Sequence, residues 1–134
     1  TPTPDPAPTP AVTPTTTASA FSPVDLGGGL STAPGAGARR LPWVDPSRTR
    51  RDAPVVVAPV GSAVRVRAED LALRRAWTVS VDAGAGWHRL AVVTSTRAGR
   101  LVLPAVVGSH AVRASFRLTT PDRATRWIVL RVRG

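Results

Sequence analysis

From residue 55 onward, apolar and polar residues alternate along short runs, a period typical of β-strands with one buried face. The apolar positions of the clearest runs are Val64 and Val66, Trp77, Val79 and Val81, Val112, Ala114, Phe116 and Leu118, and Ile128, Leu130 and Val132. Most of the residues between these positions are polar or basic. The pattern therefore predicts antiparallel strands that turn one face toward a core and the other toward solvent.

Turn-forming residues separate these runs. Residues 82–86 and 96–99 contain the glycines that tight hairpins favour, and residues 104–109 and 120–123 supply further turns. Residues 69–75 form the one segment with a brief helical pattern. The runs and turns together give about seven short strands at regular spacing. This pattern predicts an all-β fold, and within that class an antiparallel immunoglobulin-like or fibronectin-III-like sandwich over residues 55–134.

The first 54 residues have a different composition. Residues 1–20 are rich in Thr and Pro, which predicts a disordered, extended polyproline II linker of the kind that is often O-glycosylated in secreted proteins. Residues 21–54 are rich in Gly, Pro and Arg, and we expect them to be partly ordered at most. Their basic run at residues 48–51 is interpreted as solvated linker. Apolar residues in this segment that we expect to dock on the domain are Phe21, Val24, Leu26, Leu41 and Trp43.

Composition narrows the class of protein. The chain has 134 residues and a formal net charge of +10, and all 18 of its Lys and Arg positions are arginine. Lys, Asn, Gln and Tyr are absent, a bias toward GC-rich codons that indicates a high-GC bacterium. The absence of Cys excludes disulfides and Cys-ligated metals, and no apolar run approaches the ~18 residues of a membrane span. Because the sequence begins at Thr1 and lacks Met, we expect either a removed signal peptide or a larger upstream protein.

Several short motifs carry a family resemblance. The run from Trp87 to Ala91, the run from Gly99 to Pro104 and the pair Val112-Arg113 resemble the patterns W-x-x-L-A, G-R-V-x-L-P and Y-x-V-R. These patterns are typical of Ig-like (fibronectin-III-like) repeats in secreted or surface actinobacterial proteins, although His110 and Ala111 stand where such repeats often place Tyr. The resemblance implies an Ig-like fold outside the cell, in units that serve as spacers, adhesive units or appendages of hydrolases.

Residues suited to catalysis are few. Ser109 and His110 are neighbours on a strand edge, so their side chains are expected on opposite faces, and no nucleophile elbow surrounds them. The adjacent pair Glu69 and Asp70 is interpreted as a cap or as a partner of Arg74. His88 is the other histidine, and no spacing supports a metal site. We therefore expect no enzyme activity, no catalytic residue, no metal and no cofactor.

Binding is better supported than catalysis. Six arginines occupy outward strand positions, and they form a candidate polyanion-binding face if their strands are neighbours: Arg65, Arg67, Arg113, Arg117, Arg131 and Arg133. Trp127 shares the outward face of its strand with two of them and is the candidate for stacking on a ligand. Trp77 is expected in the core, and Trp87 in the core or at an edge.

The sequence thus predicts a non-enzymatic extracellular or cell-surface module, structural or adhesive, displayed on a Thr/Pro stalk. Its expected partner is a cell-wall or extracellular polysaccharide or polyanion, or an upstream or partner protein. Nucleic acid is disfavoured because no Phe or Tyr residues for stacking interleave with the basic positions and because a Thr/Pro stalk suggests the cell exterior. Two alternatives stay open. In the first alternative the chain is a carbohydrate-binding appendage of a secreted hydrolase, and in the second it is a structural subunit of an extracellular or viral assembly.

Overall fold

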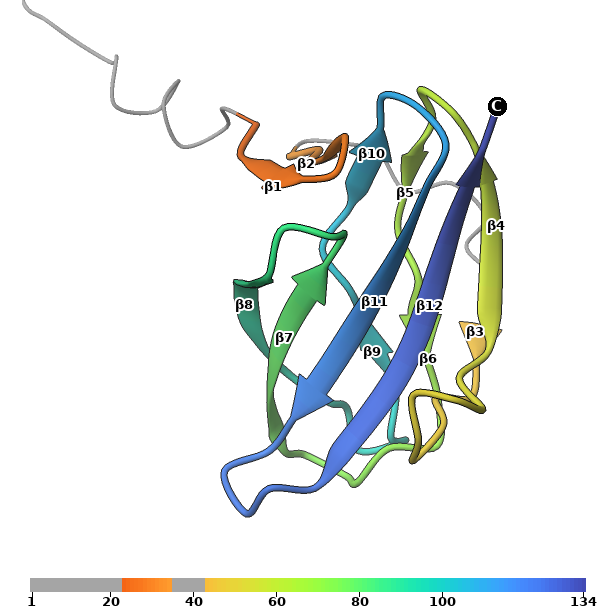
Figure 1. The fold of residues 1–134 in the computed structure, drawn as a ribbon. Coiled ribbons are helices and arrows are strands. Elements are labelled where there is room, and N and C mark those ends of the chain that lie inside the picture. Colours follow the sequence, from red (N-terminus) through yellow and green to blue (C-terminus); the bar gives the residue numbers. More distant parts are fainter. Residues whose placement is uncertain (1–22, 35–42) are drawn as a thin grey trace, which may run out of the picture.

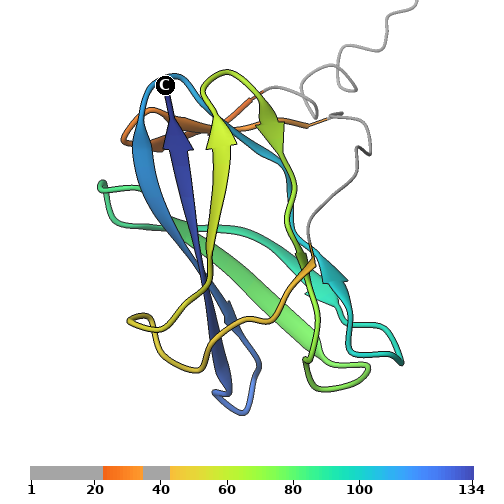
Figure 2. The same cartoon turned by 90° about the vertical axis from the view of Figure 1, so that its right-hand side faces the viewer.

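The computed structural model of the chain describes residues 23–34 and 43–134. These residues form twelve β-strands and no helix, arranged in mixed and antiparallel sheets as a sandwich-like, all-β fold. Strands β11 and β12 lie in front of β6 and β9 in Figure 1, and the view turned by 90° shows the two layers facing each other (Figure 2). The predicted Thr/Pro linker and the anchors Phe21 and Leu41 lie outside the described residues.

One layer is a five-stranded sheet. Its strand order is β4 (Val55–Pro59), β12 (Thr125–Arg133), β11 (Val112–Thr119), β7 (Ala76–Asp82) and β8 (Trp87–Thr94). All of its pairings are antiparallel except that of β4, which runs parallel to β12. The longest pairing joins β11 to β12 without a register shift, from Val112 opposite Val132 to Thr119 opposite Thr125.

The opposite layer consists of two shorter sheets. The first has the order β1 (Asp25–Gly27), β2 (Leu30–Thr32), β10 (Val106–Gly108) and β5 (Ala63–Val64), and the second has the order β3 (Trp43–Val44), β6 (Arg67–Ala68) and β9 (Leu101–Val102). Pro104, which has no N–H to donate, lies between β9 and β10. The Leu103 N–H donates to the Val66 carbonyl oxygen at 2.8 Å, so a backbone bond links the two sheets at this break.

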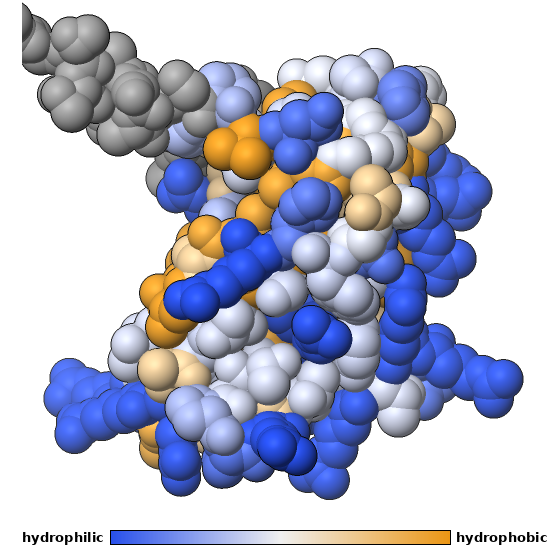
Figure 3. All heavy atoms as spheres, turned by 60° about the vertical axis from the view of Figure 1, so that its left-hand side comes forward, coloured by the Kyte–Doolittle hydropathy of each residue, from blue (hydrophilic) through white to orange (hydrophobic). Residues whose placement is uncertain are grey.

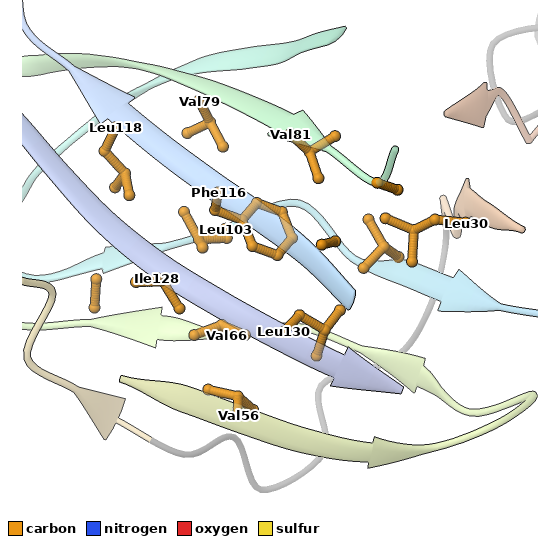
Figure 4. Packing of buried hydrophobic residues seen from close by; sticks show 14 of the residues in the cluster. Leu30, Val56, Val66, Val79, Val81, Leu103, Phe116, Leu118, Ile128 and Leu130 are labelled. Atoms are coloured by element: carbon orange, nitrogen blue, oxygen red, sulfur yellow. The ribbon is translucent and has the colours of Figure 1, made fainter. Parts of the chain in front are cut away.

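The core fills the space between the layers. Phe116 lies at its centre, with Val79, Val81 and Leu118 from the five-stranded sheet and Leu103 from the opposite layer around it (Figure 4). Leu30 and Leu26 enter the same cluster from the β1–β2 hairpin. Residues 25–32, which belong to the Gly-rich segment, therefore supply two strands and part of the core.

The predicted alternation is confirmed by burial. Every apolar position predicted to face inward on β7, β11 and β12 is buried, except for Val112, which is half-buried against the core. Trp77 is 1% exposed, and its indole N–H donates to the Ser95 hydroxyl at 3.3 Å. The Ser95 hydroxyl also donates to the Ala72 carbonyl oxygen at 2.6 Å, so this buried polar pair is satisfied.

The predicted helix at residues 69–75 is wrong. Asp70 and Arg74 have φ values of 60° and 51°, in the left-handed region that interrupts a right-handed helix. The backbone instead bonds to the β8–β9 loop, because the Leu71 N–H donates to Gly99 at 3.1 Å. Glu69 pairs with Arg100 at 3.4 Å rather than with Arg74. The segment is a crossing between the layers, and tertiary bonds determine its path.

Aspartate side chains close two of the predicted turns, those at residues 82–86 and 120–123. The Asp82 carboxylate accepts a bond from the Gly84 N–H at 2.9 Å. Asp122 accepts a bond from the Thr120 hydroxyl, and this bond, with a backbone bond and the Arg75 guanidinium, lowers the pKa of the Asp122 carboxyl. Both carboxylates thus close turns at the ends of the five-stranded sheet.

Seen from the side that carries β8, apolar surface runs as a band between hydrophilic side chains (Figure 3). Exposed apolar residues include Val92 in β8 and Val24 directly before β1. Among the described residues, no helix is long and apolar enough to cross a membrane.

The three glycines of the β1–β2 turn allow the hairpin to lie in close contact with the rest of the domain. Gly28 has a φ of 60°, and a Cβ built there would lie 2.0 Å from the Ala83 carbonyl oxygen. A Cβ on Gly29 would lie 2.2 Å from His110 Nε2. Glycine is therefore required at these positions both by backbone conformation and by the close approach of neighbouring atoms.

We predict that Gly28→Ala will displace the hairpin, whereas Gly61→Ala will not. Gly61 also has a positive φ, 83°, but no atom lies within 4 Å of a Cβ built there. Gly61→Ala therefore loses only the free energy of holding alanine in the left-handed conformation, about 1 kcal/mol. Urea unfolding should show a larger loss for Gly28→Ala, and hydrogen exchange should show faster exchange of the Ser109 N–H, which donates to Gly29 at 2.8 Å. Equal losses in the two variants would contradict the close docking of the hairpin.

Candidate binding site on the outer face of the five-stranded sheet

Arginine and tryptophan side chains gather on the outer face of the five-stranded sheet. Alternation along β11 and β12 turns Arg113, Arg117, Trp127 and Arg131 away from the core. The register places Arg117 opposite Trp127, and Arg113 opposite Arg131. Two of the predicted polyanion-binding arginines thus meet directly across neighbouring strands, and a third lies beside the predicted stacking residue.

Trp127 forms a pair with Trp87. Their ring centroids are 5.7 Å apart and the rings are tilted by 59°, although β12 and β8 are separated by β11 and β7. The two indoles therefore reach toward each other across the face of the sheet. Ser80 and Ser115, which lie on the intervening strands and on the same face, are only 8% and 5% exposed. Larger side chains thus cover the middle of this face.

Two arginines contact the indole pair. The guanidinium carbon of Arg117 lies 4.2 Å from the centroid of Trp87, and that of Arg50 lies 5.8 Å from Trp87 and 5.9 Å from Trp127. Each distance is within the range of an attractive cation–π interaction. We call these four residues, Arg50, Trp87, Arg117 and Trp127, the Trp–Arg cluster.

Arg50 reaches the cluster because its loop is bound to β12. The Trp127 N–H donates to the Ser47 carbonyl oxygen at 2.7 Å, and the Ser47 N–H donates back to Trp127 at 3.0 Å. The Arg50 Nε then donates to the Ser115 hydroxyl at 3.2 Å. The basic run interpreted as solvated linker therefore contributes a residue to the site.

A shallow pocket adjoins the cluster. It has a volume of about 250 Å³ and is lined by Arg50, Asp82, Gly84, Arg113, Ser115 and Val129. Asp82 is the only carboxylate on the five strands of this sheet, all of whose residues are described. The pocket therefore combines two guanidinium groups with one carboxylate and one hydroxyl.

The six arginines predicted to share a face are divided between the layers. Arg113, Arg117, Arg131 and Arg133 belong to the five-stranded sheet, whereas Arg67 lies in β6 and Arg65 between β5 and β6, in the opposite layer. Arg67 lies 4.2 Å from the centroid of Trp43, and Arg100 lies 5.5 Å from the same ring. Trp43, expected as an apolar anchor, is 37% exposed.

Two residues of the site were not singled out from the sequence as binding residues. Arg50 has no periodic signal because it lies in a loop. Trp87 was expected in the core or at an edge, and it lies half-buried on the edge strand β8, opposite Asp82 on the outer face. The register shift between Val79 and Ser80 changes which β8 residues face outward, and the sequence alone does not locate this shift.

Neither histidine belongs to the Trp–Arg cluster. The Ser109 hydroxyl donates to the Gly29 carbonyl oxygen at 3.1 Å, and the His110 ring packs on the same hairpin. His88 lies opposite Val81, on the inward-facing side of β8. In the part of the chain that the structure describes, no three His, Cys, Asp or Glu side chains come together as a potential metal site.

No protein-family model, curated protein or solved structure matches this chain. Its function is therefore inferred from the chemistry of its own residues. On the described surface, the Trp–Arg cluster and its adjoining pocket bring indole rings, guanidinium groups and a carboxylate together.

We predict that Arg50→Ala will destabilise the domain by about 1 kcal/mol, because it removes one hydrogen bond and the cation–π contacts. Arg51→Ala is the matched control, since Arg51 is an exposed arginine of the same loop and a surface substitution changes stability by no more than ~0.5 kcal/mol. Urea unfolding measures both. An Arg50→Ala variant as stable as Arg51→Ala would show that Arg50 does not hold the loop on the sheet.

Proposed function

We propose that the chain is a non-enzymatic, Ig-like module of the cell exterior, displayed on its Thr/Pro-rich segment, which adheres to an acidic polymer through the outer face of the five-stranded sheet. The observation that carries the proposal is the concentration of arginines around the Trp–Arg cluster. Acidic polysaccharides and the phosphate-bearing polymers of cell walls are the class of partner that fits this charge.

The charge balance of the face supports binding of an anion. Arginines point outward from β8, β11 and β12. Asp82 is the one carboxylate on the five strands of the sheet. Positive potentials from neighbouring arginines add, and they raise the local concentration of an acidic partner. The outward arginines of the sheet and its bound loop are Arg50, Arg89, Arg113, Arg117, Arg131 and Arg133.

Topology supports the Ig-like part of the proposal. In chain order, β4 is the first strand of the five-stranded sheet and β12 is its last, and the two lie side by side and run parallel. The antiparallel pair β5 and β10 lies in the opposite layer. A tryptophan buried in a central strand is a hallmark of Ig sandwiches, and Trp77 on β7 occupies such a position. Ig-like domains commonly serve as adhesive or spacer units rather than as enzymes.

A carbohydrate-binding appendage of a hydrolase is the second candidate, favoured by the half-buried pair Trp87 and Trp127. A flat sugar platform needs an open indole face, but Arg117 lies 4.2 Å over the centroid of Trp87. This contact favours an acidic partner over a neutral glycan. A structural subunit of an extracellular assembly fits the fold equally well.

The proposal predicts salt-sensitive binding to acidic polymers. Immobilised polygalacturonate and dextran sulfate should retain the protein at low ionic strength and release it as salt rises toward 0.5 M, a concentration at which the Debye length falls to about 4 Å. Unsubstituted dextran should not retain it. Trp127→Ala should weaken retention on acidic polymers only modestly; retention on neutral dextran that Trp127→Ala abolishes would favour the carbohydrate-binding appendage instead.

The arginines of the face should account for the retention. Arg113→Ala with Arg131→Ala removes two charges from the outer face, and Arg74→Ala with Arg97→Ala removes two exposed charges from the loops before β7 and after β8. Both double variants have the same net charge. We expect the first to lower the affinity about tenfold or more and the second to lower it less than threefold. Equal losses would show that net charge, and not this face, binds the polymer.

A further inference from the structure

The pocket beside the Trp–Arg cluster has features that a general attraction for polyanions does not require. We propose that it binds a single uronic acid unit of an acidic polysaccharide, with the sugar carboxylate between Arg50 and Arg113 and a sugar hydroxyl on Asp82. The inference rests on the proposed function, and it names the class of acidic polymer that this site selects.

The pocket is built from one row of residues across the sheet. Val129 lies opposite Ser115, Ser115 lies opposite Asp82, and Asp82 lies opposite Trp87. The row therefore crosses β12, β11, β7 and β8 at one level, and its backbone positions are fixed by ladder hydrogen bonds. Such a row holds polar groups in place before a ligand arrives, which lowers the entropic cost of binding.

The two arginines approach this row from different elements. Arg113 is the outward residue before Ser115 on β11, and Arg50 comes from the loop that is bound to β12. The Arg50 Nε donates to the Ser115 hydroxyl at 3.2 Å, so a ligand in the pocket would bond to the terminal nitrogens of the guanidinium. Planar guanidinium groups match the two oxygens of a carboxylate.

Asp82 determines which kind of anion fits. Its carboxylate lines the pocket and is held by the Gly84 N–H at 2.9 Å. A ligand that offers only sulfate or phosphate oxygens is repelled by this group. A uronic acid instead brings hydroxyl donors for Asp82 together with a carboxylate for the arginines, so it satisfies both signs of charge.

Size and lining fit one sugar unit. The volume of about 250 Å³ is below the ~300 Å³ at which pockets for drug-sized ligands begin. Val129 lines the floor of the pocket and is 2% exposed, and Trp87 follows Asp82 in the row. Neighbouring units of the polymer would then lie over the other arginines on the outer face of the five-stranded sheet.

Asp82→Asn distinguishes this pocket from simple charge attraction. The amide oxygen of Asn still accepts the bond from the Gly84 N–H, so the turn is kept while one negative charge is lost. Calorimetry of this variant with short oligogalacturonates and with fully sulfated dextran oligomers of equal charge should show at least threefold weaker binding of the uronate and tighter binding of the sulfate than for the wild type. Tighter binding of both ligands would refute uronate binding in the pocket but would be consistent with polyanion binding by the outer face of the sheet. If the wild-type protein binds neither, the proposed function fails as well.

A second pair of variants tests the guanidinium clamp. Arg113→Lys keeps the charge but loses the planar fork, so the affinity for oligogalacturonate should fall about tenfold. Arg97→Lys is the matched control, because Arg97 is an exposed arginine of the loop after β8 and lies outside the pocket lining, and its substitution should leave this affinity within twofold. Equal effects of the two variants on uronate binding would refute the assignment of Arg113 to the pocket.

Discussion

The antiparallel pairing of β11 with β12 is the constraint on which the rest of the structure depends. Its register runs without a shift over the full length of β11 and places Phe116 opposite Ile128 in the core and Arg117 opposite Trp127 on the outside. Because side chains alternate, a slip of one residue would exchange the two faces and bury arginines. The cost of burying unpaired charge therefore protects this register, and the same register aligns the outward arginines.

The remaining elements close the core that this pairing begins. β7 and β8 extend the sheet on one side and β4 on the other, while the opposite layer covers the apolar face. The β1–β2 hairpin completes that layer, since Leu26 and Leu30 are buried in the common core. A segment that by composition resembles a linker is thus held by two apolar residues and by glycines that allow close contact.

The outer face shows how a surplus of arginine is accommodated on a folded surface. Arg117 and Arg50 contact the indoles of Trp87 and Trp127, and Arg67 lies over Trp43 in the opposite layer. Guanidinium groups stack on aromatic rings more readily than ammonium groups do, because they are planar and weakly hydrated. The surplus of arginine therefore supplies side chains that both cover the tryptophans and make this face positively charged.

The sequence by itself determined the all-β class, the inward residues of β7, β11 and β12, and the outward direction of Arg113, Arg117, Trp127 and Arg131, because alternation with period two is a local property of the chain. The strands contributed by residues 25–32, the path of residues 69–75 and the presence of Arg50 and Trp87 in the site were decided only by the tertiary structure. Each of these depends on contacts between residues far apart in the chain, such as the Ser47 bonds to Trp127 and the register shift in β8. Such contacts have no local signature, so the chain specifies which residues face outward, and only the fold decides which of them meet.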